Sequence, residues 1–580
     1  MKAQAADGGY SMLFDKHYKI IFHNEEISYD TIRSETDRIK AMLTKQQIPD
    51  GEIVGLALKR TPLMLETIMA LLENRIPFLP IQLGLPEKRL RYMLDNAGIR
   101  RIITTQDLAS AVSCGRSCIT LDEANHALPD TQPRHITDTE GALAYVLYTS
   151  GSTGNPKAVS VKRKGLENFL HAIPQVVEGF NAGNRIACFT EYTFDIFFLE
   201  SVLALFRGMT VVLADEMEAV NPAYIAGLIQ KHGIDLVQMT PSRLRMLHLY
   251  DPALSCLKPV RTMMVGGECF PLEMLETLKH IPGMRIYNMY GPTETTIWST
   301  VSELTDKQSV DIGRPIANTE ILILDEKLSP LPDGEKGEIC IAGDGLAAGY
   351  LNAPEQTAAH FVTLADGRQI YRTGDIGYYG ADGILFCEGR MDHQIKLNGH
   401  RIELEDIEQN LMSCTGMKLL TVVFDRENNR LICFYAASDA PEDVRRKAAE
   451  VLPDYMIPAF FVQTEKLLYT SSGKADRNAM LAAYQQAAEE KAGQCSDAVD
   501  TLSQQVCAIM AEKGIVCSEK DADRTLTELG VSSLDFIELV VRFEETFDIE
   551  FDDDFLSTDQ LSDLGSLIEY IRTLAGEQNA

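Results

Sequence analysis

The segment that decides the fold is ALAYVLYTSGSTGNPKA, which runs from Ala142 to Ala158. Its apolar first part reads as a buried strand, and the strand leads directly into a loop of hydroxyl residues, glycines and Lys157. Glycines let backbone N–H groups approach phosphate oxygens, while hydroxyl groups add donors and Lys157 adds charge. Such a loop can also be a simple turn, but the strand before it and the lysine after it favour phosphate binding. It is not a Walker loop, because the chain has no GxxxxGK[ST].

Around this segment, short β-rich runs alternate with helical patterns. EIVGLAL (Glu52–Leu58) is typical of a buried strand, and TPLMLETIMALLEN is the helical pattern that follows it. This alternation favours an α/β architecture with largely parallel sheets. Beyond about residue 312 the runs are shorter and more β-rich, and a separate α+β unit is expected from Glu403.

Composition limits the class of protein. The chain has 580 residues, 45% hydrophobic and 24% charged, which predicts a folded protein of several domains. Its formal net charge of −30 argues against nonspecific nucleic-acid binding. No apolar stretch reaches the ~18–20 residues that span a bilayer, and the N-terminus lacks a signal-peptide core, so we expect a cytoplasmic protein without a membrane partner. The 12 scattered cysteines predict reduced thiols and no structural metal.

The acidic charge is concentrated at the C-terminal end. Residues 496–580 contain 20 acidic and 5 basic residues, so they carry −15 of the total −30. A segment rich in Ala, Gln and Glu, Ala482–Cys495, precedes them and suits a linker or a loosely packed helix. We therefore place a domain boundary near residue 495.

Three further segments carry side chains that suit a nucleotide. In NMYGPTETTIW (Asn288–Trp298), Tyr290 could stack on a purine and Glu294 could hold Mg²⁺, unless the segment is a solvated turn. In YRTGDIGYYGADGILFCEGR, Asp375 could accept both hydroxyls of a ribose, unless this is a hairpin with solvated charges. In SSGKADR, Lys474 at a loop tip could reach another domain's active site or could be an ordinary surface charge.

In this order and spacing, the segments resemble the core motifs of the adenylate-forming superfamily, most of all the adenylation domains of nonribosomal peptide synthetases. The resemblance runs from about Ile27 to Arg477 and includes GEICIAGDGLAAGYLN and LPDYMIP. It implies an α/β fold with a large N-terminal subdomain of mostly parallel sheets plus a β-rich part (1–391) and a small α+β C-terminal subdomain (392–481). A linker (482–498) and an all-α four-helix carrier domain (499–580) would follow.

The resemblance also implies ATP and Mg²⁺, and it assigns roles to residues. Glu294 would bind Mg²⁺, and Asn288 and Tyr290 would hold adenine. Lys474 would bridge the substrate carboxylate and the ribose–phosphate region, and rotation about a hinge at Asp392 would present Lys396. The implied catalytic residues are Thr149, Lys157, Lys396 and Lys474. The implied nucleotide-binding residues are Thr149, Ser150, Gly151, Ser152, Thr153, Gly154, Asn288, Tyr290, Gly291, Thr293, Asp375 and Arg390.

The same resemblance outlines a substrate pocket. Asp195, in TFDIFFLES, matches the aspartate that pairs with the α-ammonium group, which favours an amino acid over an aryl or fatty acid. The full set is Asp195, Ile196, Leu199, Gln238, Met264, Gly266, Met289, Ile297, Trp298 and Lys474. Because most of these side chains are large, and because the set resembles that of glycine-activating domains, we predict glycine, with alanine, serine or cysteine as alternatives.

The acidic tail resembles a peptidyl carrier domain in LTELGVSSLDFIELVVRFEETFDIEF. Carriers hold 4′-phosphopantetheine on a serine after an LG pair, and the spacing selects Ser533. A serine there could also be only a helix cap. The chain departs from the usual LGGDS form, since Val531 and Ser532 stand where Gly and Asp or His are common.

The resemblance implies that the chain loads an amino acid onto its own carrier. An acyl- or aryl-CoA ligase and a catalytically inactive scaffold are the alternatives. The carrier and Asp195 argue against the ligase. The scaffold is disfavoured by five intact residues, Lys157, Glu294, Asp375, Lys396 and Lys474. No HHxxxDG or GxSxG motif is present. The implied partners are a phosphopantetheinyl transferase, a downstream condensation or other acceptor domain in trans, and in some relatives a small MbtH-like activator.

Overall fold

We describe the protein from a computed structural model. The residues described are 14, 17–121, 141–151, 155–391, 394–397, 400–426, 428–437, 439–464, 466–468, 475–494, 502–513, 515, 517–526, 528–531, 533–547, 549, 551, 552, 555, 561 and 563–577.

The phosphate-loop segment lies in a six-stranded sheet with the order β6-β5-β3-β4-β7-β8. All of its pairs are parallel except β7 with β8, which are antiparallel neighbours joined by that loop. The strands are β3 Val54–Ala57, β4 Phe78–Pro80, β5 Arg101–Thr104, β6 Ser117–Thr120, β7 Leu143–Thr149 and β8 Lys157–Lys162.

A second sheet of nine strands lies beside it in the order β15-β14-β13-β12-β11-β9-β10-β1-β2. Its central strands, from β13 to β1, are parallel, and both edges end in antiparallel pairs. The strands are β1 Lys19–Phe22, β2 Glu25–Ile27, β9 Arg185–Cys188, β10 Thr210–Leu213, β11 Leu236–Met239, β12 Thr262–Gly266, β13 Arg285–Tyr290, β14 Thr300–Glu303 and β15 Arg314–Pro315. The predicted parallel α/β body is confirmed.

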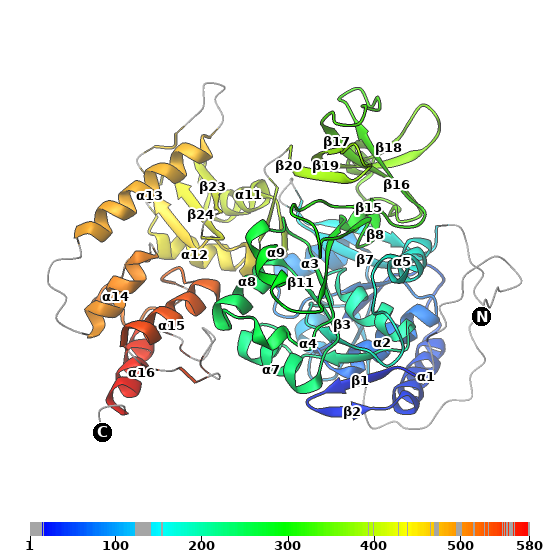
Figure 1. Cartoon of the computed structure of the whole chain (residues 1–580), viewed down its shortest axis with the longest axis horizontal. Helices are drawn as coiled ribbons and strands as arrows, with labels where there is room; N and C mark the ends of the chain where they lie inside the picture. The colour runs from blue at the N-terminus through cyan, green and yellow to red at the C-terminus, as the bar shows by residue number, and fades with distance from the viewer. Residues whose placement is uncertain are drawn as a thin grey trace, which may run out of the picture.

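Helices fill the space between the two sheets and cover their outer faces (Figure 1). One continuous core joins both sheets to α1, α2 and α5. A second packs α7, α8 and α9 on the nine-stranded sheet, and a third packs α3 on the other. The helices are α1 Tyr29–Lys45, α2 Pro62–Glu73, α3 Glu87–Asn96, α4 Ala109–Val112, α5 Arg163–Val176, η1 Leu199–Leu203, α6 Ala204–Phe206, α7 Pro222–His232, α8 Pro241–Tyr250, η2 Ser255–Leu257 and α9 Leu272–Lys279.

Local sequence explains where several of these helices begin and end. Asn221 caps α7 by accepting from the Ala223 and Tyr224 N–H groups, and Pro222 occupies the first turn, where its missing N–H costs nothing. The same helix ends at Gly233, which has φ of +54°, a conformation that glycine adopts without strain. The parallel strands are therefore joined by helices with clear start and stop signals.

A β-rich part follows, as the shorter runs predict. Its five strands pair in the order β16-β17-β19-β18, with β20 also on β19. The elements are β16 Thr319–Leu324, β17 Gly337–Gly343, α10 Pro354–His360, β18 Phe361–Thr363, β19 Gln369–Tyr379 and β20 Leu385–Arg390. The short helix η3 Thr293–Thr295 belongs to the body, between β13 and β14.

The next part is α+β. A two-stranded hairpin precedes a three-stranded sheet that is packed with two helices. The elements are β21 Ile395–Leu397, β22 His400–Ile402, α11 Leu404–Thr415, β23 Leu420–Asp425, β24 Arg430–Tyr435, α12 Pro441–Ala449, η4 Asp454–Met456, β25 Phe460–Gln463 and α13 Arg477–Gln494. Helix α13 is continuous across residue 481 and covers residues 482–494 of the predicted linker.

The C-terminal part is helical and lies against the rest of the chain (Figure 1). Its described elements are α14 Leu502–Glu512, η5 Glu519–Asp521, α15 Ser533–Phe547 and α16 Leu564–Glu577. Tyr250 of α8 packs on its core, and Arg430 of β24 donates to the Lys513 carbonyl at 2.9 Å. Gly530 allows a close approach to β25, because a Cβ there would lie 2.5 Å from the Phe460 ring.

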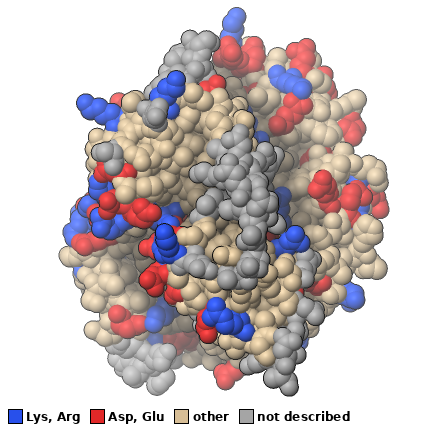
Figure 2. Space-filling view, turned by 90° about the vertical axis from the view of Figure 1, so that its left-hand side faces the viewer, with Lys and Arg blue, Asp and Glu red and all other residues tan. Residues whose placement is uncertain are grey.

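The face of the molecule on this side carries both signs of charge. Figure 2 shows lysine and arginine side chains in small groups beside acidic ones, separated by uncharged surface. Two ion pairs of this region are Arg446–Asp443 at 2.7 Å and Arg524–Glu442 at 3.4 Å. In the part of the chain that the structure describes, no helix is both long enough and apolar enough to cross a bilayer.

Candidate active site

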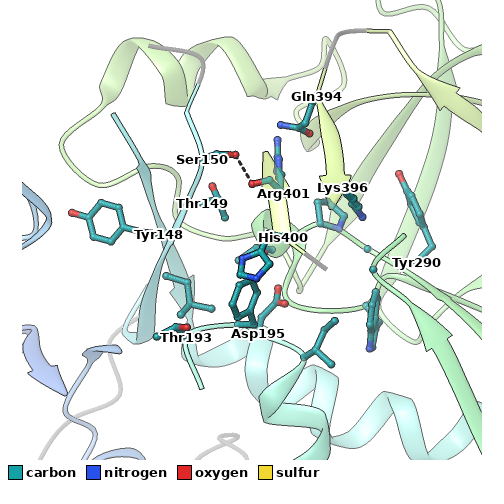
Figure 3. A pocket seen from close by; sticks show the side chains of 18 of the residues that line it. Tyr148, Thr149, Ser150, Thr193, Asp195, Tyr290, Gln394, Lys396, His400 and Arg401 are labelled. Atoms are coloured by element: carbon teal, nitrogen blue, oxygen red, sulfur yellow. Dashed lines mark hydrogen bonds between the residues drawn. The ribbon is translucent and has the colours of Figure 1, made fainter. Parts of the chain in front are cut away.

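A cavity of about 110 Å³ lies where the body, the β-rich part and the α+β part meet (Figure 3). The body contributes Leu147, Tyr148, Thr149, Ser150, Thr193, Phe194, Asp195, Ile196, Gly267, Tyr290, Gly291, Pro292, Thr293 and Trp298. The β-rich part contributes Asp375 and Arg390, and the α+β part contributes Gln394, Lys396, His400, Arg401 and Tyr455. Segments far apart in the chain therefore form one site.

One end of the cavity holds a carboxylate beside an aromatic wall. Burial raises the pKa of Asp195, while a hydrogen bond from Thr293 and the charge of Lys396 oppose that rise. Trp298 is only 2% exposed and lies across Gly266, where a Cβ would come within 2.8 Å of the indole atom Cη2. Asp195 therefore lines a cavity in which the indole of Trp298 limits the space for a ligand.

The wall behind this end is built by the carboxyl ends of neighbouring parallel strands. Gln238 of β11 pairs with Met264 of β12, and Gly266 pairs with Met289 of β13. Ligands of α/β sheets usually lie at such strand ends. All four are predicted pocket residues, but none of them is among the residues that line the cavity, and neither is Leu199 or Ile297.

The backbone before Trp298 adopts a strained conformation. Thr296 and Ile297 have φ values of +65° and +71°, which are unfavourable for β-branched side chains. The Thr296 hydroxyl donates to the Gly345 carbonyl at 2.6 Å, which helps to hold the turn. Such strain costs roughly 1–3 kcal/mol per residue and is concentrated at functional sites, where the surrounding structure maintains it.

The cavity lining also includes a second carboxylate, Asp375, with two donors. Asp375 accepts from the Tyr290 hydroxyl at 2.5 Å and from Arg390 Nη1 at 2.9 Å. Asn288 lies on the same strand as Tyr290, but its amide donates to the Asp311 carbonyl at 2.8 Å and it does not line the cavity.

Some predicted site residues lie elsewhere or outside the described residues. Lys157 is buried next to the Tyr350 ring, 5.8 Å from its centroid, and is not a lining residue. Ser152, Thr153, Gly154, Asp392 and Lys474 lie outside the described residues, and so does the side chain of Ser533.

The α+β part contributes residues that the sequence analysis missed. His400 stacks on Tyr455 with 3.8 Å between ring centroids and meets Phe194 edge-on at 4.5 Å. Burial lowers the pKa of His400 to about 3, so its imidazole is neutral at physiological pH. His400 and Arg401 stand in the segment MDHQIKLNGHRIELEDIE beside Lys396, and their proximity to that lysine was the available signal.

Two known protein families match different parts of this chain. A family described as AMP-binding enzyme matches residues 13–351, and one described as phosphopantetheine attachment site matches residues 504–571. The chain belongs to the AMP-binding enzymes. With the second match, this confirms the predicted combination of an adenylate-forming body and a carrier part.

The relatives of this AMP-binding enzyme include nonribosomal peptide synthetases. The chain is 34% identical over 549 residues to a dimodular nonribosomal peptide synthase of Bacillus subtilis (strain 168). That match covers 90% of this chain and 22% of the synthase. The chain is also 32% identical over 481 residues to tyrocidine synthase 1 of Brevibacillus parabrevis. That match covers 80% of this chain and 44% of tyrocidine synthase 1. The chain therefore spans less than half the length of these relatives.

Solved structures agree with the fold. The structure of holo-PA1221, a protein containing adenylation and carrier domains bound to a vinylsulfonamide inhibitor, matches with a TM-score of 0.81 and 25% identity over 97% of this chain and 95% of that chain. A four-domain nonribosomal peptide synthetase, holo-AB3403 bound to AMP and glycine, matches with a TM-score of 0.58 and 26% identity. That match covers 96% of this chain and 42% of holo-AB3403.

The magnesium ion expected in an AMP-binding enzyme does not fit Glu294 in this arrangement. Glu294 is fully buried, and both of its carboxylate oxygens lie 2.9 Å from Arg401 Nη1. The Tyr350 hydroxyl donates to Oε1 at 2.7 Å. Burial opposes ionisation of Glu294, but Arg401 and these hydrogen bonds outweigh it and lower the pKa of the carboxyl. The carboxylate is thus already neutralised by an arginine.

Proposed function

We propose that the chain activates a small amino acid, most favourably glycine, with ATP. The products would be aminoacyl-AMP and pyrophosphate, and the aminoacyl group would then pass to the carrier part of the same chain. The observation that carries the proposal is a single cavity lined by two carboxylates, Asp195 and Asp375. One carboxylate suits an ammonium group and the other suits the hydroxyls of a ribose.

Glycine is favoured by what surrounds Asp195. The indole of Trp298 lies against Gly266 and shortens the space near Asp195, which favours a small substrate side chain. A pocket excludes an extra methylene by steric clash more effectively than it penalises a missing one. Alanine, serine and cysteine remain the next candidates.

Residues of the chain stabilise the charge that develops during adenylation. An oxygen of the amino acid carboxylate attacks the α-phosphorus of ATP, and the bond to pyrophosphate breaks. Asp195 holds the ammonium group, Asp375 holds the ribose, and the loop that begins at Thr149 supplies donors to the phosphates. Preorganised donors of this kind are the main source of catalysis in phosphoryl transfer. Lys474 would bridge the reacting groups from its loop.

The second step needs a different arrangement of the α+β part. Lys396 lies in the cavity in this structure, which supports assigning the present arrangement to transfer onto the carrier. Phosphopantetheine on Ser533 supplies the terminal thiol that receives the aminoacyl group. Ser533 is the first residue of α15, and a helix N-terminus favours a phosphodiester there.

We further propose the domain limits and partners given by the resemblance. The units would be 1–391, 392–481, a linker at 482–498 and a carrier at 499–580, with Asp392 as the hinge. A phosphopantetheinyl transferase would load the carrier, and a downstream acceptor would take the amino acid from it. A small MbtH-like activator is a candidate partner that the assay below would reveal.

The test is ATP–pyrophosphate exchange with each of the twenty standard amino acids. We expect a dominant glycine signal that Lys474→Ala abolishes. A dominant signal from a large amino acid would retain the reaction and contradict the pocket argument. Acyl transfer to free CoA in preference to the carrier would favour the ligase alternative. No exchange by folded protein, with and without an activator, would favour the scaffold.

A further inference from the structure

Three sulfur atoms meet inside the helical C-terminal part. Cys507 and Met510 lie one turn apart on α14, so their side chains share one face of that helix. Cys517 lies just before η5, and its thiol donates to the Met510 thioether with 3.6 Å between the sulfurs. The same thiol also forms a side-chain hydrogen bond with Cys507. A helix and the segment that follows it therefore bring together two thiols and one thioether.

All three side chains are held by elements of the fold. Met510 and Cys507 are buried in the core of this part, while Cys517 packs against that core and is half-buried. The chain turns back after α14, because the Ile515 N–H donates to the Met510 carbonyl at 3.0 Å. A capping box at the start of η5 then fixes the residues next to Cys517. The sulfurs are thus preorganised, and the exposed part of Cys517 lets an ion reach them from solvent.

The spacing of the sulfurs is close to that of ligands around one metal ion. A metal–sulfur bond of about 2.3 Å places two sulfurs of a shared ion about 3.8–4.0 Å apart at tetrahedral or trigonal angles. The 3.6 Å between Cys517 and Met510 needs only a small adjustment to reach that range. A disulfide would instead bring two sulfurs to about 2.05 Å, and it would leave the thioether without a role.

The chemistry of the ligands selects the kind of metal. Thiolates and thioethers are soft ligands that favour Cu(I) and other soft ions, whereas carboxylates and carbonyls suit Mg²⁺ and Ca²⁺. Structural Zn²⁺ is normally held by four ligands drawn from thiolate, imidazole and carboxylate groups, a set without a thioether. Three sulfur ligands, one of them a thioether, therefore fit a monovalent copper ion best.

We propose that Cys507, Met510 and Cys517 form a Cu(I)-binding site in the C-terminal part. Binding forms three Cu–S bonds and releases the two thiol protons to solvent, with no change in the oxidation state of copper or sulfur. The ion joins α14 to the segment before η5 and so adds stability to a core of buried apolar residues. None of the three residues lines the adenylation cavity, so the site does not depend on the proposed function.

The test is anaerobic titration of the full-length chain with Cu(I), in competition with a chromogenic Cu(I) chelator. We expect one equivalent to bind, and Cys517→Ser to weaken that binding at least about 100-fold, since even partners outside a metal's ligand shell are worth about 10–100-fold. Met510→Leu should weaken it at least about tenfold, because a soft ligand is lost. Both variants should keep the circular dichroism of the wild type, since leucine preserves the volume of the buried methionine and Cys517 is half-buried.

Cys414→Ser is the matched control. Cys414 is also a half-buried thiol, but it lies on α11 and donates to the Leu411 carbonyl at 3.5 Å. Its replacement should leave the affinity for the one bound Cu(I) ion at the wild-type value.

Three results would overturn the proposal. Cu(I) binding that is no tighter in the wild type than in Cys517→Ser would mean that the three sulfurs only pack the core. Equal affinity in Met510→Leu and the wild type would remove the thioether from the site. A disulfide between Cys507 and Cys517 in the purified protein, found by mass spectrometry of unreduced peptides, would replace the metal site with a redox pair.

Discussion

Replacing Trp298 with alanine should widen the amino acid preference. The indole is 2% exposed and lies against Gly266, so it closes the end of the cavity beyond Asp195. Its removal leaves a space that an aliphatic side chain can fill. Glycine cannot use that space, so the expected change is in the ratio of two substrates rather than in the reaction itself.

The size of the effect follows from the buried surface. Burying a methylene group is worth about 0.8 kcal/mol, so the four side-chain carbons of leucine gain about 3 kcal/mol in the enlarged pocket. Since about 1.4 kcal/mol is a factor of ten, the leucine-to-glycine ratio should rise by about 100-fold. The cost in stability is that of a large core truncation, about 3–5 kcal/mol.

The assay is ATP–pyrophosphate exchange with glycine and with leucine, using wild type and Trp298→Ala side by side. Phe169→Ala is the control, because Phe169 is 1% exposed in the core of the body and does not line the cavity. It should lower the stability without changing the substrate ratio. A folded Trp298→Ala protein whose ratio stays within threefold of wild type would refute the argument that the indole sets the size limit.

Three further outcomes are expected. Asp375→Ala should raise the KM for ATP by about 10–100-fold with a smaller change in the KM for the amino acid, because a charged hydrogen bond is worth about 1.5–3 kcal/mol; equal changes in both would contradict a ribose contact. Ser533→Ala should abolish the mass increase on treatment with a phosphopantetheinyl transferase and CoA, whereas Ser532→Ala should retain it; the opposite pattern would move the attachment site. Burial, and then repulsion by Glu35, raises the pKa of Glu66 from its ordinary value of about 4.5 to about 8. The neutral form is therefore favoured by folding, and its contribution to stability is lost as the pH rises from about 4.5 through 8. Glu66→Gln should remove this loss and gain up to a few kcal/mol over wild type at pH 9 in urea unfolding, and equal slopes against pH would contradict it.

The fold could be predicted because its signals are local. Strand-like runs alternating with helical patterns favour largely parallel sheets with crossover helices, and both large sheets are largely parallel. The strand order could not be predicted, because it depends on how the two sheets share one core. The continuous helix α13 shows the same limit, since alanine and glutamate suit a helix and a linker equally well.

Four of the predicted site residues, Asp195, Tyr290, Asp375 and Trp298, line one cavity, and their roles there stay predictions. The amide of Asn288 donates to the Asp311 carbonyl, a contact that the motif does not reveal. The partner of Glu294 was beyond sequence reasoning, because Arg401 lies 107 residues away and contacts it only through the tertiary structure.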